Sequence, residues 1–90
     1  MKISFDEAKR QLTLRERGLD FADAAKVFAG KFLEFVDDRF DYGEARFVAY
    51  GEVDGRMVAV VWTPREEGRR IISMRHVHDE EIRAREGSMD

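Results

Sequence analysis

The sequence contains no cysteine. This absence excludes a disulfide framework, a metal site built on thiolates and catalysis by a thiol nucleophile. It is also compatible with the reducing cytoplasm, which is where we expect the protein to act. Histidine is scarce too, because His76 and His78 are the only two. They precede two carboxylates, Asp79 and Glu80, but no third ligand at a recognised metal spacing appears elsewhere, so we predict no metal site and no cofactor.

Long apolar runs are also missing. The amino-terminal stretch reaches Asp6 and Glu7 before any apolar run that is long enough for a signal peptide. Nowhere do about 18 apolar residues follow one another, as a membrane-spanning helix requires. We therefore expect neither export nor insertion into a membrane.

What is present fits one small globular domain over residues 1–90. Hydrophobic residues make up 43% of the chain and charged residues 39%, with a formal net charge of -3. This overall charge disfavours a nucleic-acid binder, but its distribution is uneven. The segment from residue 63 to residue 78 carries four arginines against two glutamates, whereas the acidic residues dominate from Asp79 onward.

Two helices are predicted at the amino terminus. Ser4 and Glu7 have the spacing of a capping box, which predicts a helix to about Arg17 that ends at Gly18. Its buried stripe would consist of Phe5, Ala8, Leu12 and Arg15. Asp20 is suited to cap a second helix that ends at Gly30, with Phe21, Ala24, Ala25 and Phe28 as its buried face.

A change to alternating apolar residues after Gly30 predicts four strands. Their expected ranges are 32–37, 46–53, 57–63 and 70–77, with a tight Asp54-Gly55 turn and a loop over residues 65–69. The third strand is apolar on both faces and should be central. Asp79 is suited to cap a short last helix that runs to about Glu86. The predicted fold class is α+β: two N-terminal helices, a four-stranded mainly antiparallel sheet and a short C-terminal helix.

Several arginines could act together on a phosphate, because guanidinium stays charged and offers a planar fork of donors. Strict alternation would place Ile71, Ser73 and Arg75 on one face and Ile72, Met74 and His76 on the other. Arg75 would then share a face with Arg46 if the strand registers agree. The alternative is that these arginines form surface ion pairs with Glu44, Glu66 and Glu67, or, for Arg75, a buried bridge to Glu44.

Metal-independent cleavage of RNA needs a base, an acid and cations that stabilise the phosphate. The candidates for proton transfer are Glu44, Lys9 and His76, and those for charge stabilisation are Arg46, Arg65 and Arg75. We expect Arg69, Arg70 and Trp62 to contact RNA. For Trp62 and Tyr50, packing in the core is the alternative to stacking on bases.

Two motifs, Tyr42-Gly43-Glu44-Ala45-Arg46 and Arg70-Ile71-Ile72-Ser73-Met74-Arg75, together resemble the BrnT family of type II toxin ribonucleases. The resemblance extends to Phe5-Asp6-Glu7-Ala8-Lys9, to residues 17–24 and to Val60-Val61-Trp62-Thr63-Pro64-Arg65-Glu66. It implies a RelE-like fold, RNA cleavage without a metal and Lys9, Glu44, Arg46, Arg65 and Arg75 at the site. It also implies a small DNA-binding antitoxin as partner, in a complex that represses its own operon. For the protein itself we expect either a homodimer or a heterotetramer with the antitoxin.

The sequence departs from the usual pattern of the family at Thr13, Glu16 and Arg17 and in its acidic tail. The family usually carries a histidine in the first helix, and His76 is the hypothesised replacement. A protein-binding module that keeps the toxin fold without catalysis is the alternative from a different class.

Overall fold

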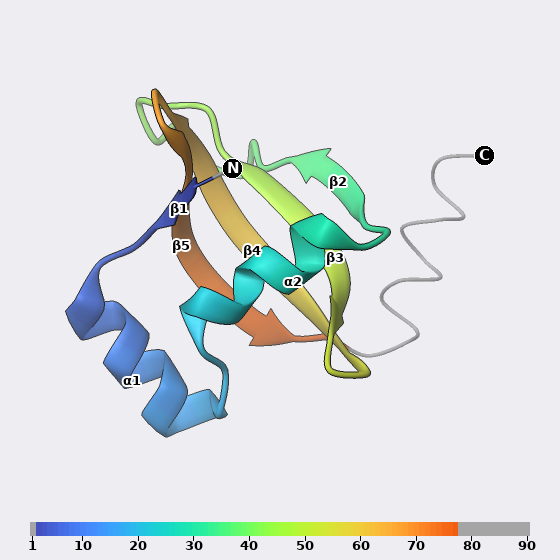
Figure 1. The fold of residues 1–90 in the computed structure, drawn as a ribbon. Coiled ribbons are helices and arrows are strands. Elements are labelled where there is room, and N and C mark those ends of the chain that lie inside the picture. Colours follow the sequence, from blue (N-terminus) through green and yellow to red (C-terminus); the bar gives the residue numbers. More distant parts are fainter. Residues whose placement is uncertain (1, 78–90) are drawn as a thin grey trace.

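The computed structural model describes residues 2–77 (Figure 1). A mixed five-stranded sheet, in the order β1-β5-β4-β3-β2, is accompanied by two α-helices and one turn of 3₁₀ helix. The elements in chain order are β1 (Lys2–Ser4), α1 (Glu7–Arg17), η1 (Phe21–Asp23), α2 (Ala24–Ala29), β2 (Leu33–Val36), β3 (Phe47–Val53), β4 (Arg56–Arg65) and β5 (Gly68–His76).

The predicted four-stranded sheet is wrong, because a fifth strand, β1, pairs with β5 in parallel. Ser4, which was expected to cap the first helix, is the last residue of this strand instead. The close approach of β1 to β5 depends on Gly68, because a Cβ atom at this position would lie 2.0 Å from the carbonyl oxygen of Lys2. The loop predicted over residues 65–69 is also shorter than expected, since only Glu66 and Glu67 separate β4 from β5. The predicted C-terminal helix lies outside the described residues.

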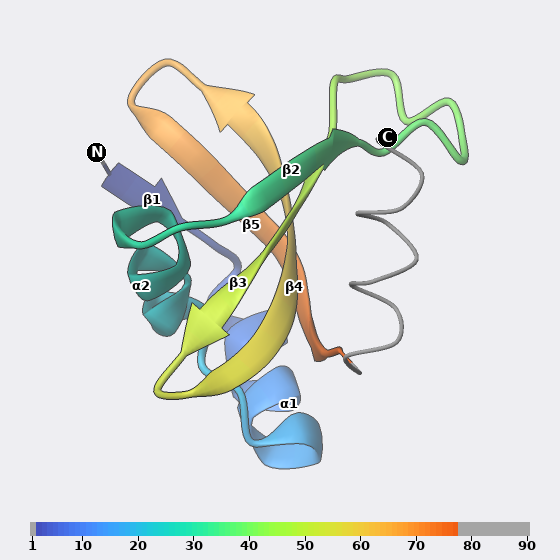
Figure 2. The same ribbon diagram turned by 90° about the vertical axis from the view of Figure 1, so that its right-hand side faces the viewer.

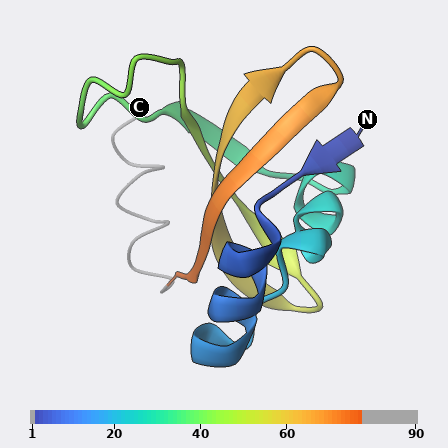
Figure 3. The ribbon, with the colours of Figure 1, turned by 90° about the vertical axis from the view of Figure 1, so that its left-hand side faces the viewer.

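The first helix begins at Glu7 and is capped by Asp6 rather than by Ser4. The Asp6 carboxylate accepts a hydrogen bond of 3.0 Å from the Lys9 amide. Gly18 ends the helix in the left-handed conformation, with φ 68°, as predicted. Of the predicted buried stripe, Phe5 packs against the core, but the prediction is wrong for Ala8, Leu12 and Arg15, because α1 contains no buried residue and Leu12 is 46% exposed. The reason is that the segment after α1, and not α1, lies across the middle of the sheet (Figures 2 and 3).

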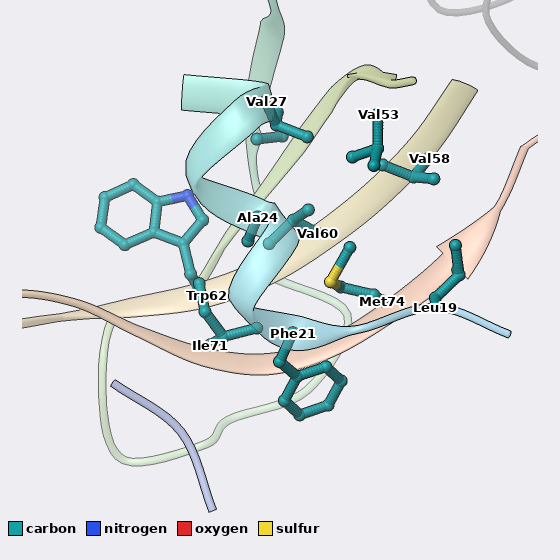
Figure 4. Close-up of a cluster of buried hydrophobic side chains, with 11 residues drawn as sticks. Leu19, Phe21, Ala24, Val27, Val53, Val58, Val60, Trp62, Ile71 and Met74 are labelled. Atoms are coloured by element: carbon teal, nitrogen blue, oxygen red, sulfur yellow. The ribbon is translucent and has the colours of Figure 1, made fainter. Parts of the chain in front are cut away.

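That segment supplies the helical side of the core (Figure 4). Asp20 accepts a hydrogen bond from the Ala22 amide, so the second helical segment begins as η1 and continues as α2. Its buried residues are Phe21, Ala24 and Val27, spaced by three, whereas the predicted core residue Ala25 is exposed. They pack on Ala49, Val53, Val58, Val60, Trp62, Ile71 and Met74 of the sheet.

Strand β4 is central in the sheet, as predicted. It follows β3 through the predicted two-residue turn, in which Asp54 and Gly55 both have positive φ. Pairing of β4 with β5 shifts between Val61 and Trp62, whose partners are Ser73 and Ile71. Ile72 is therefore the extra residue of a bulge.

The bulge corrects the predicted faces of β5. Trp62 lies on the helical face, and its partner Ile71 therefore lies there too, together with Met74. Ser73 and Arg75 lie on the opposite face. Strict alternation had placed Ile71 with Arg75, because it cannot anticipate an unpaired residue. Among residues 2–77 no helix has the length and the apolar character needed to span a membrane.

Candidate functional site

The face of the sheet turned away from α1 and α2, called the far face below, carries most of the arginines predicted for the site. Its rows follow from the strand registers. One row contains Leu33, Tyr50, Ala59 and Arg75, and the next contains Phe35, Val48, Val61 and Ser73. A third row contains Asp37, Arg46, Thr63, Arg70 and Ser4. Asp37 belongs to it because its amide donates to the Arg46 carbonyl. Arg46 lies opposite Thr63 because the neighbouring residues of the two strands, Phe47 and Trp62, are paired.

Arg46 of this third row and Arg65, two residues beyond Thr63 in β4, share one carboxylate. Arg46 Nε lies 3.4 Å from Glu44 Oε2, and Arg65 Nη2 lies 3.5 Å from Glu44 Oε1. The Arg46 guanidinium also lies 3.9 Å from the centre of the Tyr42 ring. We call Tyr42, Glu44, Arg46 and Arg65 the Glu44 cluster. It confirms the predicted alternative that Arg46 and Arg65 pair with Glu44, and it holds two cations within reach of one anion.

Thr63 fixes the loop that carries this cluster. Its hydroxyl group is buried and donates a hydrogen bond of 2.6 Å to the Ala45 carbonyl, between Glu44 and Arg46. Arg65 Nη1 in turn donates to the Thr63 hydroxyl oxygen over 3.4 Å. A single buried side chain on the central strand therefore positions the loop and touches one of the guanidiniums.

Asp37 is a buried carboxylate of the far face that sequence analysis did not single out. Its side chain is only 1% exposed and accepts two hydrogen bonds from Arg39, of 2.8 and 3.0 Å, and one of 3.4 Å from the Tyr42 hydroxyl. The hydrogen bonds from Arg39 lower the pKa of Asp37 below its ordinary value. The signal was available, because Asp37 continues the inward alternation of Leu33 and Phe35.

A small pocket of about 110 Å³ connects Asp37 with Arg75. Phe35, Val48, Tyr50 and Val61 form its apolar walls, and Arg39 and Arg75 bring donors to its rim. Arg75 is two rows, or about 13 Å along the strands, away from Arg46. The structure thus places Arg75 on the same face as the Glu44 cluster but not in it. Arg70 is nearer, since it is paired with Thr63.

The remaining predicted site residues lie on the helical side. His76 is on α1's side of β5, where its Nε2 lies 2.9 Å from the Arg17 carbonyl oxygen. Lys9 lies on the exposed surface of α1. The structure therefore does not bring the two candidate proton-transfer groups, Lys9 and His76, to the Glu44 cluster.

Trp62 and Arg69 are also on the helical side. Phe47 stacks on the Trp62 ring at 5.0 Å between centroids, and the Arg69 guanidinium lies 4.8 Å from the same ring. The indole N–H of Trp62 donates to Glu34 over 2.7 Å. Trp62 thus packs in the core, as its alternative role predicted.

The chemistry available at the Glu44 cluster is the binding of an anion with two oxygens. Guanidinium groups bind carboxylate and phosphate with the same fork of donors, so a phosphate could take the place that Glu44 now fills. Between residues 2 and 77 no three His, Asp or Glu side chains gather as metal ligands would.

A family model described as "Ribonuclease toxin, BrnT, of type II toxin-antitoxin system" matches residues 5–81 of the chain. The matched range contains β2 to β5 and the whole Glu44 cluster. No curated protein matches the sequence.

Proposed function

This chain belongs to the BrnT family of ribonuclease toxins of type II toxin-antitoxin systems, and we propose that it cleaves RNA without a metal ion and thereby inhibits translation. The observation that supports the proposal is the pair of guanidiniums, Arg46 and Arg65, held around Glu44 on one face of the sheet. Family membership implies an antitoxin partner. We further propose that this partner is a small DNA-binding protein and that its complex with the toxin represses their own operon.

In the proposed mechanism the phosphate of a bound RNA sits between Arg46 and Arg65. The 2′-oxygen attacks the phosphorus as its proton leaves, the bond from phosphorus to the 5′-oxygen breaks, and the products are a 2′,3′-cyclic phosphate and a 5′-hydroxyl group whose oxygen takes a proton from solvent water. Negative charge grows on the phosphate oxygens during this step, and two fixed cations stabilise that charge most strongly where it develops. The phosphate displaces Glu44 from part of its contact with the guanidiniums, which leaves the carboxylate beside the reacting group. Glu44 is then the nearest candidate to accept the 2′-hydroxyl proton. Arg70 and Arg75, on the same face, would hold the neighbouring parts of the RNA.

Lys9 and His76 remain predicted proton-transfer groups of this proposal. Their place on the helical side means that neither reaches the Glu44 cluster in the described arrangement. Replacing either residue by alanine should therefore leave cleavage within about twofold of wild type if Glu44 is sufficient. A loss of cleavage in His76→Ala, with folding intact, would instead support the hypothesis that this imidazole serves the reaction.

The decisive experiment is cleavage of a single-stranded RNA by the purified protein in the presence of EDTA. Wild type should cleave, and Arg46→Ala should reduce the rate about 100-fold or more, as the loss of a charge-stabilising donor typically does. Arg56→Ala is the matched control, because Arg56 is an exposed arginine at the hairpin end of β4. Cleavage that disappears with EDTA would contradict the metal-independent mechanism.

A second function, protein binding without catalysis, is favoured by the separation of Lys9 and His76 from the arginines. In that case the isolated protein would neither cleave RNA nor arrest growth when expressed alone, while it would still bind its antitoxin. The proposed RNA cleavage places the activity in the cytoplasm. The oligomeric state, a homodimer or a heterotetramer with the antitoxin, remains a prediction that light scattering can test.

A further inference from the structure

The two edges of the sheet differ in what they offer to another protein. The β1 edge presents Lys2 and Ser4, which are exposed and polar. The opposite edge is formed by β2, which lies beyond β3 in Figure 1 and pairs only with it among the described strands. Exposed sheet edges are templates for pairing with a further strand unless charge, proline or a covering element blocks them.

The outer side of β2 carries backbone groups that point away from β3. The Asp37 amide donates to the Arg46 carbonyl over 2.8 Å, so this pair is hydrogen-bonded across the two strands. In an antiparallel ladder such pairs alternate, and the residues between them direct their N–H and C=O groups to the other side. Glu34 and Val36 therefore present these groups at the edge.

Apolar side chains accompany this edge. Val36 is 67% exposed and Phe40, four residues further along, is 70% exposed. In the described part of the chain the other exposed large apolar residues are Leu12 and Leu14 of α1, which are less exposed, at 46% and 38%. Exposed apolar residues next to backbone groups that can pair are the combination on which strand addition depends.

The edge also leads directly to the proposed RNA site. The chain that leaves β2 contains Asp37, Arg39 and Phe40 and continues into Tyr42, Glu44 and Arg46. The Glu44 cluster and its row carry three arginines, Arg46, Arg65 and Arg70, against the carboxylates of Glu44 and Asp37, so the excess of positive charge is confined to these rows, whereas the chain between them and β2 adds Asp38 and Asp41 to Arg39. A peptide that followed the edge past Val36 would need acidic side chains where it meets these arginines.

We propose that the β2 edge is the docking site of an extended segment of the antitoxin, which adds a sixth strand, covers Val36 and Phe40 with apolar side chains and places acidic side chains against Arg46 and Arg65. The proposal rests on the function proposed above. Docking in this way would silence the toxin, because the carboxylates of the antitoxin would occupy the position of the RNA phosphate.

The first test measures binding of the purified antitoxin, taken as the product of the reading frame adjacent to that of the toxin. Val36→Asp and Phe40→Asp should each weaken binding at least tenfold, because a charge would be buried against the apolar side chains of the added strand. Leu12→Asp is the matched control, an exposed leucine on α1 replaced in the same way, and should bind within twofold of wild type. Wild-type affinity in both edge variants would overturn the proposal.

A second pair of variants tests the backbone pairing itself. Val36→Pro removes an N–H that points outward and leaves the bonds to β3 in place. It should weaken binding at least tenfold, whereas Val36→Thr, which keeps the N–H and the branched shape, should bind nearly as wild type. Equal affinities for the two variants would exclude strand addition.

RNA cleavage by each variant without antitoxin separates the two proposals. Edge variants that cleave as wild type but resist inhibition by the antitoxin support both. If wild type does not cleave RNA while the edge variants still bind the antitoxin more weakly than wild type, the proposed function fails and the docking site stands. If the edge variants change only self-association of the toxin, measured by light scattering, the edge is a contact between copies and the docking proposal fails.

Discussion

Glu44 is the residue around which the candidate site is organised. It neutralises part of the charge of Arg46 and Arg65 and keeps both guanidiniums in place before any substrate arrives. Groups that are already oriented for the transition state need no reorganisation during the reaction, which is how fixed dipoles and charges accelerate it. In the proposed mechanism the same carboxylate would oppose RNA by its negative charge, so its effects on binding and on catalysis would have opposite signs.

Replacement of Glu44 by glutamine should separate these effects. RNA should bind more tightly to Glu44→Gln, because one negative charge is removed from the site. The cleavage rate at saturating RNA should fall about 100-fold or more if the carboxylate accepts the proton. Single-turnover kinetics measure both quantities, and an unchanged rate would remove Glu44 from proton transfer.

Asp37 should make the stability of the protein depend on pH in the acid range. Its pKa is lowered in the folded state, first of all by the hydrogen bonds from Arg39, and the ordinary value is 3.8. A folded-state pKa below the unfolded one means that the ionised carboxylate stabilises the fold above about pH 4, and that this contribution is lost as the pH falls through the folded pKa.

The corresponding variant is Asp37→Asn, with the exposed neighbour Asp38→Asn as control. Urea unfolding should find Asp37→Asn less stable than wild type at pH 7, and the difference should shrink as the pH is lowered below about 4. An equal difference at pH 7 and pH 3 would show that the ionised form does not contribute.

At the scale of elements, the sequence predicted local features better than those that depend on distant partners. The Asp54-Gly55 hairpin, the Gly18 helix end and the central strand β4 follow from local signals and were predicted correctly. Pairing of β1 with β5 joins residues more than sixty positions apart, and no periodicity in three residues can indicate it. The bulge at Ile72 is equally invisible to alternation.

The correct cap of α1 can be tested by comparing two alanine substitutions. Asp6→Ala should cost about 1 kcal/mol of stability, the usual effect of losing an N-cap. Ser4→Ala should change stability by less than about 0.5 kcal/mol, because Ser4 belongs to β1 and is exposed. Chemical denaturation of both variants decides whether Asp6 or Ser4 caps the helix. A larger loss of stability in Ser4→Ala than in Asp6→Ala would support the capping box that begins at Ser4.

The parallel pairing of β1 should depend on the missing side chain at Gly68. A Cβ atom there would lie 2.0 Å from the Lys2 carbonyl oxygen, and the φ of 155° is unfavourable for alanine. Gly68→Ala should therefore release β1 and destabilise the fold by about 1 kcal/mol or more. Hydrogen exchange should show faster exchange in β1 with little change in β3, and retained protection of β1 would contradict this account.

For the whole molecule, the layers were predicted only in part. Helices before a largely antiparallel sheet were expected, but α1 was given a buried stripe that the structure assigns to η1 and α2. Of the arginines chosen for the site, Arg46, Arg65, Arg70 and Arg75 share the far face, and Arg69 does not. Which face each strand residue takes depends on registers and on the bulge, and these are set by packing across the whole sheet.

Phe21 should carry a large share of the stability of so small a protein. Its side chain is fully buried and contacts Phe5 edge-to-face at 6.0 Å between ring centroids. Phe21→Ala should cost about 3–5 kcal/mol, out of about 5–15 kcal/mol for a typical domain. Thermal unfolding measures the loss, with Phe40→Ala as the exposed control. Toxicity lost in Phe21→Ala would then report unfolding and not a role in the reaction.

The unpaired Ile72 has a consequence for comparing this chain with its relatives. If it were deleted, Trp62 and Val61 would keep Ile71 and Ser73 as consecutive partners in a regular ladder, and Met74 and Arg75 would remain on their present sides. A homologue that is one residue shorter here would thus display the same surface. An alignment gap at this position is therefore compatible with a shared site. A gap elsewhere in the strand would move the side chains that follow it to the opposite face of the sheet.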